Sequence, residues 1–560
     1  MPPHRPPRKA CDLCYRKKIK CDAHLQRPRC SHCVVYDSPC TFEAASRKHR
    51  ARKHPEAPSS EQSQIKQLEE NLSQALAKID QLESSRNVPM SSDAPSGMIL
   101  AGLQEPEPEP EEEEQGKIFD VVDGWSPSPS PLDLPPLHEA LPVVEKYLAT
   151  LNSVIPLFHP GRLLNSLRDL YAPRSQRHCA TWAAINVVLA LAHSSHAPFD
   201  RHKAAHYLNR AQARLTEIIM GDADTINVQV LLGLAMLFQG ARNLKPAAMI
   251  TAIALRLAHE LGLHARGRSE GLNASAILER NRVFWIAYII DRDISMRTGQ
   301  PPVQLETDID IDLPPDDPED GAGLVFAPDH SSRFNYFRAR VQLATIQWKV
   351  YEAMYSVRAQ SLDVHQRNEN LAELRHMLDD WASQIPPQFR PNAVLRTYGP
   401  DSLRSFGILY SSHLSCRALI CRAHAMETPW LQSLQEFGRK SLQRRITEPV
   451  VLPQGWQVLV NESREYMRLF MGVERKDPAF IWMTGCTYIT GSICLIANNM
   501  LYPTYETWRY DQSLAESSLP LLEEMIQQEP YEPLKKIQNA CCQLLQLAYN
   551  ISLQNNSFHF

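Results

Sequence analysis

The sequence lacks the short motifs that most often carry enzyme chemistry. It contains no G-x-S-x-G nucleophile turn, no phosphate-binding P-loop and no H-E-x-x-H zinc-protease pair. Five aspartates follow one another closely, but they lack the glycine and the distal glutamate of a calcium loop. These are Asp308, Asp310, Asp312, Asp316 and Asp317. We therefore expect solvated or helix-capping acids here, and a protein that is not an enzyme.

The chain also has little that would take it into or across a membrane. Residues 1–10 are dominated by Pro, Arg and Lys and hold no apolar run, so we expect no secretory signal. The uncharged stretch from Ala479 to Ala497 is interrupted by Thr, Ser and Gly, which favours a buried helix over a membrane span. A chain that is not secreted keeps its 13 cysteines reduced, and this favours metal binding over disulfides.

Net positive charge is confined to the N-terminal part of the chain. Residues 1–54 hold 14 Lys and Arg against 4 Asp and Glu, a net charge of +10, whereas the whole chain carries −4. The remaining residues are therefore acidic, at −14. A small basic end on a large acidic body is typical of a nucleic-acid reader attached to another domain.

Six cysteines crowd into the same basic end. They are Cys11, Cys14, Cys21, Cys30, Cys33 and Cys40. Their spacing is C-x2-C-x6-C twice, with the second half repeating the first at an offset of 19 residues. Paired C-x2-C turns indicate zinc, and six thiolates complete two tetrahedral sites only if two of them bridge both metals. We therefore expect two Zn²⁺ per chain, bridged by equivalent cysteines of the two halves.

Other interpretations of these cysteines are a zinc module that binds protein rather than DNA, and a redox pair at Cys11 and Cys14. His32 is close enough to compete as a ligand. Six thiolates already satisfy two zinc ions, however, so we expect this histidine to be a surface side chain.

The segment from Ala10 to Asp22 resembles the first half of the cluster in fungal binuclear zinc-cluster transcription factors. Pro28 to Cys33 resembles the second half. The resemblance implies that Cys11 and Cys30 are the bridges and that the peptide bond before Pro28 is cis. One departure is Tyr15, where the family usually has arginine, so one phosphate contact of the family is in doubt here.

A run of cations follows the second cysteine. It consists of Arg16, Lys17, Lys18 and Lys20. The run offsets the negative charge of a zinc–thiolate cluster and offers a short helix end to the major groove of DNA. The resemblance implies that Lys17 and Lys18 read a CGG triplet, and lysine suits the O6 and N7 acceptors of guanine. The alternative is that all four cations contact only phosphates.

Residues 61–85 predict a short coiled coil, because an apolar 3–4 repeat runs through them. The repeat consists of Ile65, Leu68, Leu72, Ala75, Ile79 and Leu82. Ile at one core position and Leu at the other favours two parallel strands, hence a homodimer. The alternative is an amphipathic helix packed on the body.

The connector from Thr41 to Gln64 carries a second basic run. It consists of Arg47, Lys48, Arg50, Arg52 and Lys53. Such a run is typical of a nuclear-import signal or of an arm that follows DNA phosphates, although it can also be an inert solvated segment. In a dimer, this connector would set the spacing of the two half-sites.

Residues 86–136 predict a disordered acidic and proline-rich linker. Positions 105–114 alone hold seven glutamates and three prolines, and such a stretch cannot bury enough apolar surface to fold. Residues 118–125 mix acids with bulky apolar groups. They fit an activation segment and a plain tether equally well.

From residue 137 onward the chain predicts an all-α body. Residues 181–192, 228–238 and 247–263 have helical length and spacing, and Val283, Ile286, Ile290 and Ile294 form one stripe. Prolines at 301, 302, 314 and 315 end this run and begin an irregular segment.

Several stretches of the body resemble the regulatory domain of the same family. They are Ala254 to His264, Arg282 to Trp285, Asp291-Arg292, Gly299 to Pro301 and Asp308 to Pro314. Gln300 stands where the family has arginine. We assign residues 137–400 to this domain and residues 401–560 to its C-terminal helical part. The resemblance implies control of activation, in some members by a small-molecule effector.

We therefore expect a nuclear, sequence-specific regulator of RNA polymerase II transcription, an activator of a metabolic or secondary-metabolite gene set. Its expected partners are double-stranded DNA, a second copy of the chain, the transcription machinery and a small effector, with no membrane. The competing hypothesis is a zinc-stapled adaptor whose basic end meets acidic protein partners.

Overall fold

The computed structural model describes the zinc-cluster segment and most of the body. The described residues are 10–18, 21–22, 29–35, 38–42, 134–172, 178–195, 199–269, 271–421, 428–444, 450, 452–473, 477–503, 506–528 and 532–556. The chain divides into two compact units, residues 1–91 and 92–560. The predicted coiled coil, the basic run 47–53 and the linker up to residue 133 lie outside the described residues.

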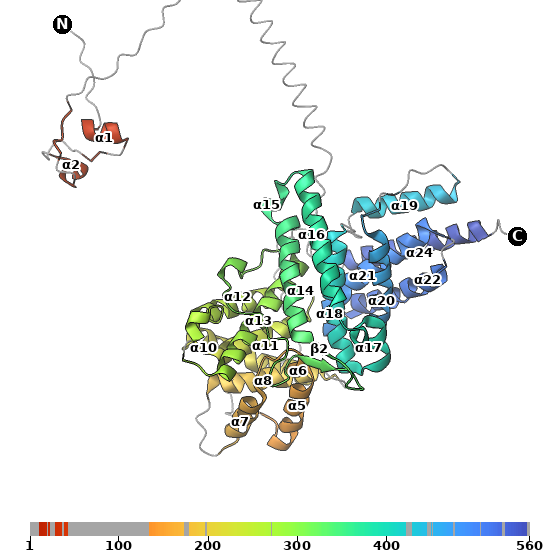
Figure 1. Cartoon of the computed structure of the whole chain (residues 1–560), viewed down its shortest axis with the longest axis horizontal. Helices are drawn as coiled ribbons and strands as arrows, with labels where there is room; N and C mark the ends of the chain where they lie inside the picture. Colours follow the sequence, from red (N-terminus) through yellow and green to blue (C-terminus); the bar gives the residue numbers. More distant parts are fainter. Residues whose placement is uncertain are drawn as a thin grey trace, which may run out of the picture. The chain divides into compact units, whose positions relative to one another are not determined.

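Two very short helices form the described part of the N-terminal unit. Helix α1 spans Asp12–Lys17 and α2 spans Ser31–Val35, and each begins one residue after the first cysteine of its half (Figure 1). Helices of five or six residues are too short to be stable in water without support. Their stability must therefore come from the cysteines that they carry.

The first part of the body is a bundle of helices. They are α5 (Leu137–Ala149), α6 (Leu151–Val154), α7 (Pro160–Leu170), α8 (Cys179–Ser195), α9 (Arg201–Gln212), α10 (Leu215–Met220), α11 (Thr225–Gln239), α12 (Lys245–Glu260), the 3-10 turn η1 (Arg266–Ser269) and α13 (Ala274–Thr298). α8 and α11 are apolar on nearly all sides and lie buried in a common core with α13. The helices predicted over 181–192, 228–238 and 247–263 are thereby confirmed.

The proline-rich segment after α13 is irregular, as predicted. It contains the short turn η2 (Glu306–Asp308) and a small antiparallel hairpin of β1 (Leu324–Phe326) and β2 (Arg333–Asn335), with Val325 opposite Phe334. The body is therefore helical apart from this one hairpin among the described residues. Gly323 precedes the hairpin at φ +92°, where a Cβ would lie 2.7 Å from the Cβ of Phe337. Only glycine fits that position.

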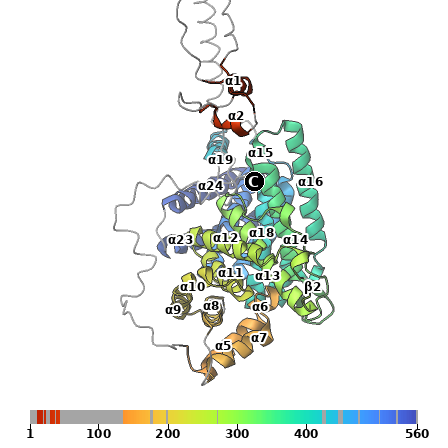
Figure 2. The same cartoon turned by 90° about the vertical axis from the view of Figure 1, so that its left-hand side faces the viewer.

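The second part of the body is also helical. Its elements are α14 (Tyr336–Val350), the π-turn η3 (Tyr351–Tyr355), α15 (Val357–Gln360), α16 (Val364–Ser383), η4 (Pro387–Phe389), α17 (Pro391–Thr397), α18 (Pro400–Ile420), α19 (Thr428–Leu442), α20 (Trp456–Gly472), α21 (Pro478–Leu501), α22 (Trp508–Glu516), α23 (Ser518–Gln528) and α24 (Glu532–Asn556). α14 and α16 run side by side along one flank in both views (Figures 1 and 2).

A second hydrophobic core joins α14 and α16 to α18, α20 and α21. Among the described residues, one helical stretch is long and apolar enough to cross a membrane, and it is the Ala479–Leu501 part of α21. In its most apolar window, 83% of the residues are buried inside the protein. As predicted, this uncharged stretch is a helix buried in the body.

Candidate zinc centre

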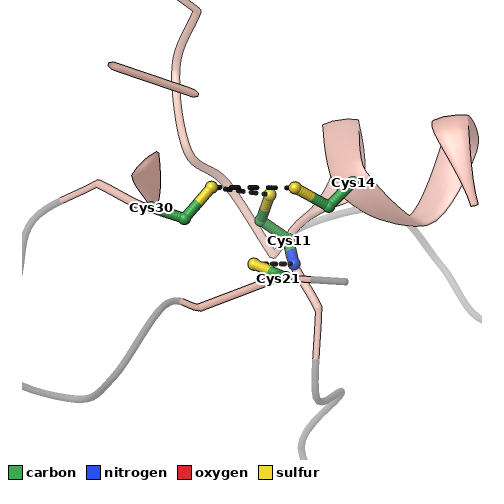
Figure 3. A group of neighbouring side chains, drawn as sticks. All are labelled: Cys11, Cys14, Cys21 and Cys30. Carbon is green, nitrogen blue, oxygen red and sulfur yellow. Dashed lines mark hydrogen bonds between the residues drawn. The ribbon is translucent and has the colours of Figure 1, made fainter. Parts of the chain in front are cut away.

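The six cysteines predicted as ligands come together at the start of the chain. Cys14 of α1 and Cys33 of α2 are buried, as are Cys11 and Cys30, which directly precede these helices. Cys21 and Cys40 are half-buried. Figure 3 shows the sulfur atoms of Cys11, Cys14 and Cys30 converging from two segments of the chain, with Cys21 beside them. The helices place them, because a C-x2-C spacing brings both thiols of each half to one side of a helical turn.

The distances between the sulfur atoms fit a shared metal centre. The Sγ atom of Cys11 lies 3.8 Å from that of Cys30 and 3.7 Å from that of Cys33, and Cys14 lies 3.7 Å from Cys30. A tetrahedral zinc site with Zn–S bonds of about 2.3 Å has sulfur–sulfur edges of about 3.8 Å, whereas a disulfide bond is about 2.05 Å long. The thiols are therefore spaced as metal ligands and not as disulfides.

The sulfur atoms form two groups of four that share two members. One group is Cys11, Cys14, Cys21 and Cys30, and the other is Cys11, Cys30, Cys33 and Cys40. Within each group the ligand atoms all lie within 4.8 Å of one another. This arrangement fits two tetrahedral ions, with the shared Cys11 and Cys30 in the bridging positions. The pair is the one that the resemblance to the family implies.

The internal repeat is visible as a near-two-fold symmetry of the hydrogen bonds. The backbone N–H of Cys11 donates to the sulfur of Cys21 at 3.4 Å, and that of Cys30 donates to the sulfur of Cys40 at 3.4 Å. Both pairs are related by the 19-residue offset. Each half therefore closes its own loop in the same way.

Two acid–hydroxyl pairs tie the halves to each other. The hydroxyl of Thr41 donates to the Asp12 carboxylate at 3.0 Å, and Ser31 donates both its hydroxyl and its backbone N–H to Asp22. Asp12 and Ser31 are equivalent by the repeat, as are Asp22 and Thr41, with acid and hydroxyl exchanged. Neither pair was predicted from the sequence, although the 19-residue offset relates the residues of one pair to those of the other.

The environment of the cysteines changes their acidity in opposite directions. The backbone N–H of Cys33 donates to the sulfur of Cys30 and lowers the pKa of that thiol to about 6. Burial raises the pKa of the thiols of Cys14 and Cys33. Zinc ligation requires thiolates, so the backbone favours the ligating form at Cys30.

The predicted DNA-reading cations lie at the end of α1. Arg16, Lys17 and Lys18 are exposed, and Lys18 ends the helix in the left-handed region at φ 54°, which few residues other than glycine adopt. Lys20, the side chain of Tyr15, Pro28 and the second basic run lie outside the described residues. His32 is exposed and belongs to neither cysteine group, as expected for a surface side chain.

Most of the aspartates of the irregular segment pair with arginines. Asp312 lies 2.6 Å from Arg266, Asp316 2.7 Å from Arg338 and Asp317 2.6 Å from Arg333. Within the described parts of the chain, only the two cysteine groups bring together side chains that could hold a metal ion. The paired acids are exposed at the surface, as expected for solvated groups.

Comparison with known proteins adds two family matches. Residues 9–49 match the fungal Zn(2)-Cys(6) binuclear cluster domain, and residues 144–383 match the fungal specific transcription factor domain. The cluster domain binds two zinc ions, and proteins of this kind bind DNA, act with the transcription machinery and are generally nuclear.

Relatives with curated names are transcription factors. The chain is 32% identical to an ABC-transporter-regulating transcription factor of Aspergillus fumigatus, over 74% of this chain and 47% of the relative. The corresponding protein of Aspergillus oryzae gives the same figures, so the chain spans about half the length of these relatives. A fusaridione A cluster transcription factor of Fusarium heterosporum is 26% identical over 60% of this chain and 65% of its own.

No solved structure matches the chain. The cysteine geometry, the two matched domains and the named relatives agree with one another. The chain belongs to the fungal binuclear zinc-cluster transcription factors.

Proposed function

We propose that the protein is a dimeric nuclear activator that reads CGG-type half-sites in the promoters of a metabolic or secondary-metabolite gene set. The observation that carries this proposal is the position of an exposed cationic helix end next to two four-thiol groups that share Cys11 and Cys30. A metal-held helix with cations at its tip is a known means of entering the major groove.

In this proposal the six cysteines are the ligands of two zinc ions. Zinc supplies structural energy at such a site, because ligation is coupled to folding. The residues of the chain then do the recognition. The hydrogen bonds that the sulfur atoms of Cys21 and Cys40 accept connect the two ends of each half. The hydrogen bonds that Asp12 and Asp22 accept hold the two halves together.

Base reading is assigned to Lys17 and Lys18. Their ammonium groups donate hydrogen bonds, and guanine presents two acceptors, O6 and N7, in the major groove. The left-handed backbone at Lys18 turns the chain away from the helix axis directly after α1. Arg16 and Lys20 are assigned to the same DNA contact, where they also neutralise phosphates.

Dimer formation is assigned to the heptad repeat of residues 61–85, with Arg47 to Lys53 as the import signal or phosphate arm. The support is the sequence pattern alone. Two clusters on one dimer would read two half-sites, and this would add the specificity that one small module lacks.

The relatives suggest which genes are controlled. Two are named as regulators of ABC transporters and one as the regulator of a fusaridione A cluster. We propose a set of export or secondary-metabolite genes, with the helical body responding to a small effector and contacting the transcription machinery.

Binding of the full-length protein to duplexes that contain CGG half-sites, compared with scrambled duplexes over a range of salt concentrations, tests this proposal. We expect site-specific binding whose affinity falls steeply with salt, because phosphate contacts release counterions. Equal affinity for both duplexes would overturn the proposal and favour the adaptor that meets acidic proteins.

A further inference from the structure

A pocket of about 380 Å³ lies in the first part of the body, between α5, α6, the start of α7 and the N-terminal half of α13. α5 and α7 lie side by side at the same end of the body in Figures 1 and 2, with α6 next to them. Its volume falls within the range of about 300–1,000 Å³ that is usual for small-ligand sites. All of its lining lies inside the matched regulatory domain.

The pocket presents two opposite charges on one helix face. Glu279 and Arg282 lie three residues apart on α13, so they are neighbours on its surface, and both line the pocket. Their side chains are only 14% and 11% exposed. Gln229 of α11 fixes the acid from behind, because its amide donates to the Glu279 Oε1 atom at 3.2 Å.

Each of these buried charges contacts a more exposed partner on another segment of the chain. Arg162 of α7 lies 2.7 Å from the Glu279 Oε2 atom and is 59% exposed. That contact lacks hydrogen-bond geometry, and the buried Oε2 atom has no hydrogen-bond donor among the described residues. Asp320 accepts two bonds of 2.6 Å from Arg282 and is 45% exposed.

A ligand that carries both charges could replace these two partners, because Arg162 and Asp320 are more exposed than the groups they contact. The bidentate contact of Asp320 with Arg282 is also the geometry that any ligand carboxylate would adopt there. Arg162 follows the lining residues His159 and Pro160 and supplies the positive charge beside Glu279 that a ligand ammonium would supply.

The remaining wall is partly apolar, although Asn152, Ser153, His159 and Ser275 also line it. Leu148, Pro156, Phe158 and Leu278 line the pocket, and Phe158 is 4% exposed. The apolar part of the wall favours a ligand that carries an apolar group next to its charged end.

We propose that this pocket binds a small zwitterion with an apolar body, of the size of an apolar α-amino acid. The carboxylate of the ligand binds Arg282 in place of Asp320, and its ammonium binds Glu279 in place of Arg162. Only the regulatory meaning of this site rests on the proposed function, since binding itself does not require DNA.

Calorimetry on the full-length, zinc-loaded protein tests the site with three matched probes. L-Phenylalanine carries both charges, 3-phenylpropionate lacks the ammonium and 2-phenylethylamine lacks the carboxylate. We expect phenylalanine to bind at one site per chain, and each single-charge probe to bind at least tenfold more weakly. No saturable binding of phenylalanine, or equal binding of a single-charge probe, would overturn the proposal.

Substitutions separate a ligand site from a merely structural cluster. Glu279→Gln and Arg282→Gln should weaken phenylalanine binding at least tenfold. Arg162→Gln and Asp320→Asn remove the competing partners, so they should tighten it about two- to fivefold. Arg333→Gln removes a comparable surface ion pair, that with Asp317, and should change nothing. Unchanged or weaker binding in Arg162→Gln and Asp320→Asn would contradict the assignment.

Affinity for CGG duplexes, measured on the same preparations, keeps the two proposals apart. Specific DNA binding without phenylalanine binding would overturn the pocket alone. Phenylalanine binding without specific DNA binding would overturn the DNA-reading proposal alone.

Discussion

Cys11 and Cys30 are the residues on which the account of the cluster depends. The count of six thiolates required two bridges, and the resemblance to the family indicated this pair. The two groups of sulfur atoms share these same two residues. The spacing of the cysteines was enough to predict the two metal sites, because each C-x2-C turn is local, whereas the choice of this pair came from the resemblance. Asp22 and Thr41 were missed because their partners come from the other half of the cluster.

Replacing a bridging cysteine should therefore cost more metal than replacing a terminal one. We expect Cys30→Ser to lose both zinc ions, because its thiolate is a ligand in both groups. Cys40→Ser is the matched control and should retain the ion held by Cys11, Cys14, Cys21 and Cys30. Zinc per chain, measured by mass spectrometry, checks this. One firmly bound zinc in Cys30→Ser would argue against bridging.

Lys18 should contribute to base choice as well as to affinity. Lys18→Ala should reduce discrimination against a mismatched CGG triplet by about 1–3 kcal/mol, because a donor to guanine is lost. A binding selection with randomised half-sites measures the change. Lys245→Ala, an exposed lysine of the body, is the control and should have no effect. An unaltered base preference in Lys18→Ala would mean that Lys18 contacts phosphates and no bases.

At the scale of elements, periodicity predicted the long helices well and the short hairpin not at all. α11 and α12 were visible because their apolar residues recur over many turns. β1 and β2 have three residues each, which is too short for an alternating pattern to stand out. The hairpin depends on the packing of Phe334 and Gly323 against later segments, and no local pattern encodes such contacts.

Buried polar residues inside the helices were equally hard to predict. Arg292 in α13 is fully buried, and its partners Asp291, Glu306 and the carbonyl of Gln304 include groups that follow in the irregular segment. Likewise, nothing in the sequence around Glu279 and Arg282 indicates that these two charges are buried. Their burial becomes apparent only when α7 and the loop around Asp320 are in place.

His413 in α18 makes the stability of the second core dependent on pH. It is fully buried, stacks on Trp381 and lies 3.0 Å from the hydroxyl of Tyr466. Burial, with a further contribution from Arg417, lowers the pKa of His413 from 6.5 to about 3. The unfolded chain therefore binds a proton below pH 6.5 that the folded chain does not, and stability is lost as pH falls.

The expected loss is roughly 1–1.5 kcal/mol at pH 5.5 relative to pH 7.5. Urea unfolding of the wild type and of His413→Gln at both pH values measures it, since other groups contribute equally to both proteins. The variant should show a smaller decrease on acidification. An identical decrease in the two proteins would mean that His413 is not held neutral.

At the scale of the whole molecule, the charge distribution along the sequence predicted a basic nucleic-acid-binding end attached to an acidic body. It did not foretell how the body is joined together. The matched regulatory domain ends at residue 383, yet α14 and α16 share their core with α18. Tyr336 donates to the carbonyl of Ser405 at 2.7 Å, which ties α14 to α18 directly.

A chain that stops at residue 400 should therefore fail to fold as a stable body. It would expose the apolar faces of α14 and α16 that α18 covers, and exposed patches of this kind favour aggregation. Size-exclusion chromatography and thermal unfolding of residues 134–400, compared with residues 134–560, check this. A monomeric, cooperatively unfolding short fragment would show that the second core is dispensable.

The measurement that bears most directly on the central claim couples metal content to DNA recognition in the full-length protein. Zinc is removed stepwise with a chelator while zinc per chain and affinity for CGG and scrambled duplexes are recorded together. We predict that preference for CGG is lost with the two zinc ions and returns when two per chain are restored, because ligation holds α1 in shape. A preference for CGG that survives in the metal-free protein would contradict the account.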